Sequence, residues 1–218
     1  MEVQLPKIEL FGCPVHCLSM SQTIAVIDET IRQRKRLQHV VVNAAKLVNM
    51  QKDVMLRESV INSDIINADG QAVVWASRIL GSPLPERVAG IDLMAKLVEL
   101  AYRKNYRIFF LGAKEEVVKK VVDRYSQEYS TGIIAGYRNG YYSKEEEAGI
   151  ARLIADSNAD ILFVAMSSPK KEIFLHTYKE FIDTPFIMGV GGSFDVVSGI
   201  TRRAPRWMQR NGLEWLYR

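Results

Sequence analysis

The sequence predicts an α/β fold, a mostly parallel, Rossmann-like sheet with helices on both faces and a small β-hairpin at the N-terminus. Short runs rich in β-branched residues recur along the chain, as in strands that are buried on both faces of a parallel sheet. Segments with apolar residues at helical spacing separate these runs, which is the alternation of βαβ units. Hydrophobic residues make up 48% of the 218 positions, enough to form a core on each side of such a sheet.

The N-terminal part of the chain predicts a hairpin followed by a helix. Residues 8–18 alternate roughly in hydropathy and contain a glycine and a proline, so we expect two short strands there. Ser19 and Gln22 have the spacing of a capping box, and the helix that they open should end near Gln33. The basic run at 32–36 is interpreted as a solvated helix end, with contact to lipid or nucleotide as the alternative.

Six strands and the helices between them complete the predicted sheet. The strands are expected at 39–43, 65–67, 107–111, 133–135, 161–165 and 186–190. Ser143 and Glu146 form a second capping box, and Ile150, Leu153 and Ile154 are expected to be the buried stripe of the helix that follows.

Composition limits the class of protein without choosing a function. We expect one domain over residues 1–218, because the chain has no Pro/Ser-rich linker and no internal repeat. The formal net charge of +4 suits an anionic partner such as a nucleotide, a lipid phosphate or a membrane surface. Cys13 and Cys17 are interpreted as packed thiols in a reducing compartment. We expect neither a signal peptide nor a membrane-spanning helix, because no apolar run approaches about 18 residues.

Polar residues that directly follow strands are the candidate ligands, because parallel sheets bind ligands beyond the carboxyl ends of their strands. Asn43 and Asp69 are two of them. Asp69 is interpreted either as a helix N-cap or as a general base that takes a proton from a hydroxyl. Arg87 could bind an acidic residue, or a phosphate through its planar guanidinium. Asp92 is expected to be the N-cap of the next helix.

The segment at 165–172 combines a strand end with a helix start. Ser167 follows the strand, and Pro169 is expected to open the helix, where its missing N–H costs nothing. Lys170 and Lys171 then lie in the first turn, where their charge opposes the helix dipole. A locally unfavourable choice at this kind of turn predicts an anionic ligand.

A glycine-rich turn at 189–195 follows the last predicted strand. Phe194 occupies the third glycine position of a dinucleotide-binding fingerprint, so Gly191 and Gly192 are interpreted as allowing close approach of the backbone to a ligand or a neighbouring strand. Asp195 ends this turn. The chain has no Asp-x-Asp pair and its histidines are scattered, so we expect no metal site.

The C-terminal segment, residues 201–218, is basic and contains tryptophan. It has five arginines and one acid, Glu214, with Trp207 and Trp215 among them. This composition fits a segment at a membrane interface. The alternative is a terminal helix that packs its tryptophans on the domain, and both can hold.

The same segments resemble the WecG/TagA/CpsF family of bacterial glycosyltransferases, and most closely its branch that transfers N-acetylmannosamine or its uronic acid. The resemblance lies in VNA (42–44), ADG (68–70), RVAGID (87–92), FLG (110–112), AMSSPKKE (165–172), GVGGSFD (189–195), RAP (203–205) and GLEWLYR (212–218). These motifs occur in the order found in the family and span nearly the whole chain.

The resemblance implies an inverting transferase that uses no metal or other cofactor. Its donor would be a UDP-sugar and its acceptor N-acetylglucosamine on undecaprenyl diphosphate, in the synthesis of cell-surface polysaccharide or teichoic acid. By resemblance, Asp69 is the general base, Asn43 and Arg87 are pocket residues, and the loop at 191–195 binds the nucleotide-sugar. We expect a cytoplasmic protein held peripherally on the anionic inner face of the cell membrane, with no nucleic-acid partner. Self-association into a homo-oligomer is left open.

Departures from the family pattern at three residues and at the end of the chain bear on the donor and on activity. Val41 stands where many members have threonine, and Ser167 and Lys171 stand where glycine and glutamine are usual. Lys171 adds a positive charge, which suits either an acidic donor or a donor that binds in a different way. Family members also continue past residue 218 with a basic tail, so we expect weak activity if the chain is truncated.

Other functions remain as alternatives to the main prediction. The first is the same reaction with another UDP-sugar, such as glucose or glucuronic acid. The second is an NAD-dependent dehydrogenase, and the third a nucleotide-binding or membrane-assembly module without catalysis. The main prediction requires that Asp69 and the turn at Gly191 converge in one cleft above the sheet.

Overall fold

The computed structural model describes residues 5–217, without the side chains of Arg210 and Trp215. Three expectations therefore fall partly outside the described residues: the missing signal peptide at the first four residues, the terminal Arg218, and the packing of Trp215. The formation of one domain over the full chain stays a prediction.

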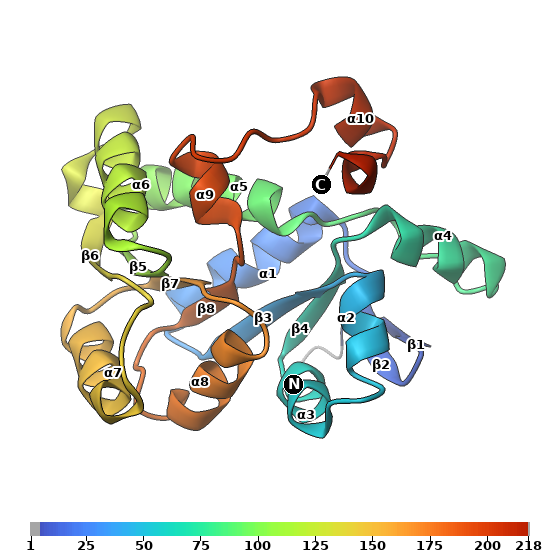
Figure 1. The fold of residues 1–218 in the computed structure, drawn as a ribbon, viewed down its shortest axis with the longest axis horizontal. Coiled ribbons are helices and arrows are strands. Elements are labelled where there is room, and N and C mark those ends of the chain that lie inside the picture. The colour runs from blue at the N-terminus through green and yellow to red at the C-terminus, as the bar shows by residue number, and fades with distance from the viewer. Residues whose placement is uncertain (1–4, 218) are drawn as a thin grey trace.

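A parallel sheet forms the centre of the molecule, as predicted (Figure 1). Within residues 5–217 it has six strands in the order β4-β3-β8-β7-β5-β6, and each neighbouring pair is parallel. Their bounds are β3 Leu37–Val42, β4 Ile65–Ala68, β5 Ile108–Gly112, β6 Ile134–Arg138, β7 Ile161–Ala165 and β8 Phe186–Gly189. The predicted hairpin is also confirmed, with β1 (Lys7–Leu10) antiparallel to β2 (Cys13–His16).

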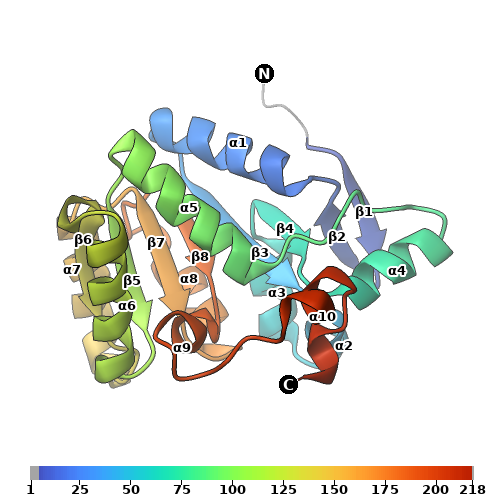
Figure 2. The ribbon, with the colours of Figure 1, turned by 90° about the horizontal axis from the view of Figure 1, so that it is seen from above.

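Helices cover both faces of the sheet because the side chains of each strand alternate between two apolar layers (Figures 1 and 2). Phe110 of β5 packs in the layer of α1, α5, α6 and α9, whereas Phe109 packs in that of α7 and α8. The bounds are α1 Met20–Arg32, α2 Ala44–Asn49, α3 Val54–Ile61, α4 Gln71–Ile79, α5 Gly90–Lys104, α6 Glu115–Glu128, α7 Glu147–Asp156, α8 Lys170–Tyr178, α9 Ser193–Val197 and α10 Arg206–Arg210.

Several local predictions are confirmed and three are wrong. The capping boxes of Ser19 and Ser143 are both present. Asp92 is not an N-cap, because α5 already begins at Gly90 and Asp92 lies in its first turn. Leu153 is 46% exposed rather than buried, because Ile150, Ala151 and Ile154 form the inner stripe of α7. Pro169 is the N-cap of α8 rather than its first helical residue.

A buried polar group links β3 to β4 and α1. His39 Nε2 lies 2.9 Å from Asn67 Oδ1, and the Thr23 hydroxyl donates to the same oxygen at 3.3 Å. His39 is 1% exposed, and burial lowers its pKa from 6.5 to about 4. The imidazole is therefore neutral in the folded protein at neutral pH.

Stability should fall when the pH drops from 7.5 to 5. The unfolded chain takes up a proton on His39 near pH 6.5, whereas the folded chain does so only near pH 4. Stability from this group is therefore complete above pH 6.5 and is lost as the pH falls towards 4, by about 2 kcal/mol at pH 5. Urea denaturation at both pH values measures this, and His39→Gln should reduce the difference. An equal loss in the variant would contradict the assignment to His39.

Candidate active site

A cleft of two adjoining cavities opens at the carboxyl ends of the strands. The larger has a volume of about 600 Å³ and the smaller about 520 Å³. The end of β3 contributes Asn43 to the larger cavity, the end of β4 contributes Asp69, and the turn after β8 contributes Gly191. These strands are neighbours in the order β4-β3-β8, so segments far apart in the sequence converge in one cleft, as the main prediction requires.

Asp69 lies on a tight connection between β4 and α4. Its N–H donates to Val42 O at 2.9 Å, which extends the β3–β4 pairing by one residue. Gly70, not Asp69, is the N-cap of α4, so the N-cap interpretation of Asp69 is wrong. A side chain at Gly70 would stand 3.3 Å from Cβ of Asn43, and the glycine therefore lets the two turns approach closely.

Asn43 is the N-cap of α2 and also faces the larger cavity. Its Oδ1 accepts the Lys46 N–H at 2.9 Å, which fixes the first turn of α2. Val41, which stands where the family resemblance has threonine, lines the same cavity and brings an apolar surface to it.

Arg87 lies between Asp69 and the C-terminal segment. Its Nε donates to Asp69 O at 2.6 Å, and one terminal nitrogen lies 3.8 Å from Asp69 Oδ1. The same guanidinium bonds the carboxylate of Glu214. Arg87 therefore positions the backbone of Asp69 and at the same time holds the end of the described chain over the cleft.

Glu214 and Arg203 extend this ion network. Arg203 Nε donates to Glu214 at 2.9 Å, and its terminal nitrogens contact both Asp92 oxygens at 2.5 and 2.9 Å. Burial alone would raise the pKa of Glu214, but hydrogen bonds from Arg203 and Arg87 outweigh it and hold that pKa below its usual value. The network anchors the C-terminal segment through ion pairs of Arg87 and Arg203 with Glu214 and of Arg203 with Asp92.

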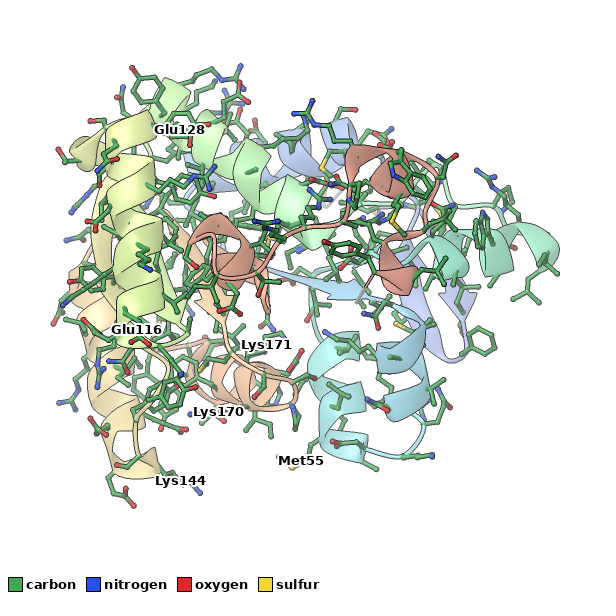
Figure 3. All side chains as sticks on the ribbon, turned by 45° about the horizontal axis from the view of Figure 1, so that its top comes forward. Met55, Glu116, Glu128, Lys144, Lys170 and Lys171 are labelled. Atoms are coloured by element: carbon green, nitrogen blue, oxygen red, sulfur yellow. The ribbon has the colours of Figure 1, made fainter. Side chains whose placement is uncertain are left out.

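The two lysines at the start of α8 differ in position (Figure 3). Lys170 lines neither of the two cavities. Its Nζ donates to Gly140 O at 3.1 Å and lies 4.1 Å from the centre of the Tyr142 ring. Lys171 lines both cavities and is nearly buried. The predicted anionic ligand would therefore meet Lys171 rather than Lys170.

The remaining predicted residues surround the junction of the two cavities. Ser167 lines the smaller cavity, whereas Gly191, Gly192 and Asp195 line both. Gly191 has φ +54°, a left-handed conformation that turns the chain from β8 towards α9. Of the predicted site residues, all but Lys170 therefore border this cleft.

Sequence reasoning missed two charged residues, Lys46 and Glu172. Lys46 lines the larger cavity, and its Nζ bonds Glu172 at 2.9 Å across 126 positions of sequence. The available signal for Lys46 was its place in the first turn of a helix, where a positive charge opposes the helix dipole, as at Lys171. Glu172 gave no local signal because its partner on α2 is distant in sequence.

Two further findings concern the described residues alone. Within residues 5–217, no three His, Cys, Asp or Glu side chains cluster so that they could hold a metal ion. In the same part of the chain, the helices are all too short or too polar to cross a membrane.

Comparison with known proteins gives one family and related enzymes. Residues 8–218 match the model of the glycosyl transferase WecG/TagA/CpsF family. An N-acetylglucosaminyldiphosphoundecaprenol N-acetyl-β-D-mannosaminyltransferase of Bacillus subtilis (strain 168) is 43% identical over 157 residues, which cover 72% of this chain and 60% of that enzyme. The enzyme of the same name from Bacillus spizizenii is 41% identical over 162 residues, 74% of this chain and 62% of the relative. The chain thus spans about three fifths of the length of these relatives.

Proposed function

The chain belongs to the WecG/TagA/CpsF family of glycosyltransferases, and we propose that it transfers N-acetylmannosamine or its uronic acid from a UDP-sugar to undecaprenyl-diphosphate-linked N-acetylglucosamine. The names of the Bacillus relatives support the acceptor and the sugar. The observation that carries the proposal is the convergence of Asp69, Asn43 and the glycine-rich turn in one cleft.

Asp69 is proposed as the general base of an inverting transfer. The acceptor hydroxyl gives its proton to the Asp69 carboxylate, and its oxygen forms a bond to the anomeric carbon of the donor. The bond from that carbon to the diphosphate oxygen breaks, and UDP leaves with the electron pair. Because Arg87 bonds the carbonyl of Asp69, the backbone that bears the carboxylate is held in place.

The donor is proposed to lie across the junction of the two cavities. Lys171, Gly191 and Asp195 border both, so a nucleotide in the smaller cavity would direct its diphosphate and sugar towards Asp69 in the larger one. Cationic side chains offset the charge that develops on the leaving diphosphate, a role that needs no metal. Lys171 and Arg87 are the proposed cations from the cleft itself.

The other predicted functions find less support. The glycine-rich turn follows β8, the last strand within residues 5–217, and α9 after it has five residues. This arrangement does not fit the βαβ unit that binds NAD, so the dehydrogenase is not favoured. A different UDP-sugar donor, such as glucose or glucuronic acid, is not favoured either, because both Bacillus relatives are named as N-acetylmannosaminyltransferases.

A transfer assay tests the proposed function. The acceptor is N-acetylglucosamine on a short-chain lipid diphosphate, and the donors are UDP-N-acetylmannosamine, its uronic acid, UDP-glucose and UDP-glucuronic acid. We expect a disaccharide product with inverted anomeric configuration from an N-acetylmannosamine-type donor. Binding of UDP without transfer to this acceptor from any donor would instead support a nucleotide-binding module.

Peripheral contact with an anionic membrane is proposed for the C-terminal segment. Trp207 is 60% exposed, so it does not pack on the domain, and Leu216 is exposed as well. Arg202 and Arg206 are exposed on the same segment, which suits anionic lipid beside an apolar insertion. With acceptor embedded in vesicles, anionic lipid should raise the rate and Trp207→Ser should reduce this gain, whereas Leu153→Ser on α7 should not.

A further inference from the structure

Three charged side chains from two helices meet beside the cleft. Lys46 Nζ of α2 and Lys171 Nζ of α8 each lie 2.9 Å from the same oxygen, Oε1 of Glu172. All three side chains are nearly buried, with 12%, 9% and 3% of their surface exposed. The two ammonium groups are therefore held close together by one carboxylate.

The charges of this group do not cancel. Burial alone would raise the pKa of Glu172, but the two lysines outweigh it and lower that pKa, so the carboxylate is ionised. Two ammonium groups against one carboxylate leave an excess positive charge in a place with little water. Burial and the neighbouring charge of Lys46 lower the pKa of Lys171, as expected for a buried cation that shares its only carboxylate partner with a second cation.

Both lysines face the larger cavity, whereas Glu172 lines neither cavity. The excess charge is therefore presented to the cleft, on the side where a ligand would enter. A buried charge that lacks a full partner is costly, and an anion in the cleft would supply that partner.

The backbone around the two lysines fixes where this charge lies. A side chain at Gly189, the last residue of β8, would stand 3.0 Å from Cδ and Cε of Lys171. The glycine thus leaves the space that the stem of Lys171 occupies. On the other side, the Asn43 cap holds the backbone of Lys46. Both supports come from the strand ends that also border the cleft.

We propose that Lys46 and Lys171 together form a binding site for an oxyanion of the donor, and this rests on the proposed function. The oxyanion is either the diphosphate of the nucleotide or a carboxylate on the sugar ring, which have the same chemistry towards paired ammonium groups. Lys46 thereby joins Lys171 as a residue that sets donor affinity, and a carboxylate ligand would make the pair a determinant of donor specificity.

The test uses Lys46→Met and Lys171→Gln with four probes: inorganic pyrophosphate, UDP, UDP-N-acetylmannosamine and its uronic acid. Each substitution should weaken binding of the recognised probes about 10- to 100-fold, measured by calorimetry. Equal losses for UDP and both UDP-sugars assign the site to the diphosphate. A loss confined to the uronic acid assigns it to the sugar carboxylate. Lys120→Met, on the exposed outer side of α6, is the matched control and should bind like the unmodified protein.

Stability separates this proposal from a purely structural role. Removal of either lysine leaves a one-to-one ion pair with Glu172, so both variants should fold. Their midpoints of urea unfolding should be no lower than that of the unmodified protein. Reduced stability with unchanged affinity for every probe would overturn the proposal. Binding of pyrophosphate that depends on Lys46, without binding of any UDP-sugar, would refute the proposed function and leave the anion site supported.

Discussion

Replacing Asp69 with asparagine should lower the turnover of the proposed transfer by about 10²–10⁴-fold, the usual contribution of a general base. Asparagine has nearly the shape of aspartate but cannot take the proton of the acceptor hydroxyl. Because Arg87 bonds the backbone carbonyl of residue 69 rather than relying on its carboxylate alone, the local structure should persist. Steady-state kinetics with saturating donor and acceptor measure the loss as a change in kcat.

The control for this variant is Asp123→Asn, an exposed residue of α6 away from the cleft, which should keep full turnover. Circular dichroism and UDP affinity should be the same for both variants, because neither substitution alters the nucleotide contacts that we propose. Unchanged turnover in a folded Asp69→Asn protein would remove Asp69 from the role of base. Loss of UDP binding as well would point to a structural defect instead.

Much of the fold could be predicted because its signals are local. β7 was predicted over its observed range, since a run of apolar residues that begins after Asp160 and ends before the serines at 167 and 168 indicates a central strand. The capping boxes depend on residues three positions apart, and both formed. Leu153 was placed wrongly because a periodic pattern leaves open which side of the stripe faces the sheet.

The site could be predicted in outline but not in its electrostatics. Asp69 and Gly191 follow strands, and the carboxyl ends of parallel strands share one edge of the sheet, so their convergence was foreseeable. The strand order that makes β4, β3 and β8 neighbours was not, because it depends on packing of the whole chain. For the same reason the pairings of Lys46 with Glu172 and of Arg87 with Glu214 had no signal in sequence spacing.

Gly112→Ala should be the most damaging of the glycine-to-alanine changes in this protein. Gly112 ends β5 with φ +124°, and an added Cβ would stand 2.2 Å from Ala165 O of β7. That oxygen accepts the Ala113 N–H at 2.8 Å, so the clash falls on a hydrogen bond at the wall of the smaller cavity. Backbone strain costs about 1–3 kcal/mol, and moving two central strands apart costs more. We therefore expect the free energy of unfolding to fall by more than about 4 kcal/mol.

Gly149→Ala is the matched control because it adds the same methyl group where space is free. Gly149 is exposed in α7, and an added Cβ would meet no described atom within 4 Å. Alanine restricts the unfolded chain and favours the helix, so this variant should gain about 0.5–1 kcal/mol. Urea denaturation should therefore show that the same added methyl group lowers the stability of the Gly112 variant and raises that of the Gly149 variant. Similar stability of both variants would contradict a close approach of β5 and β7 at Gly112, at the wall of the smaller cavity.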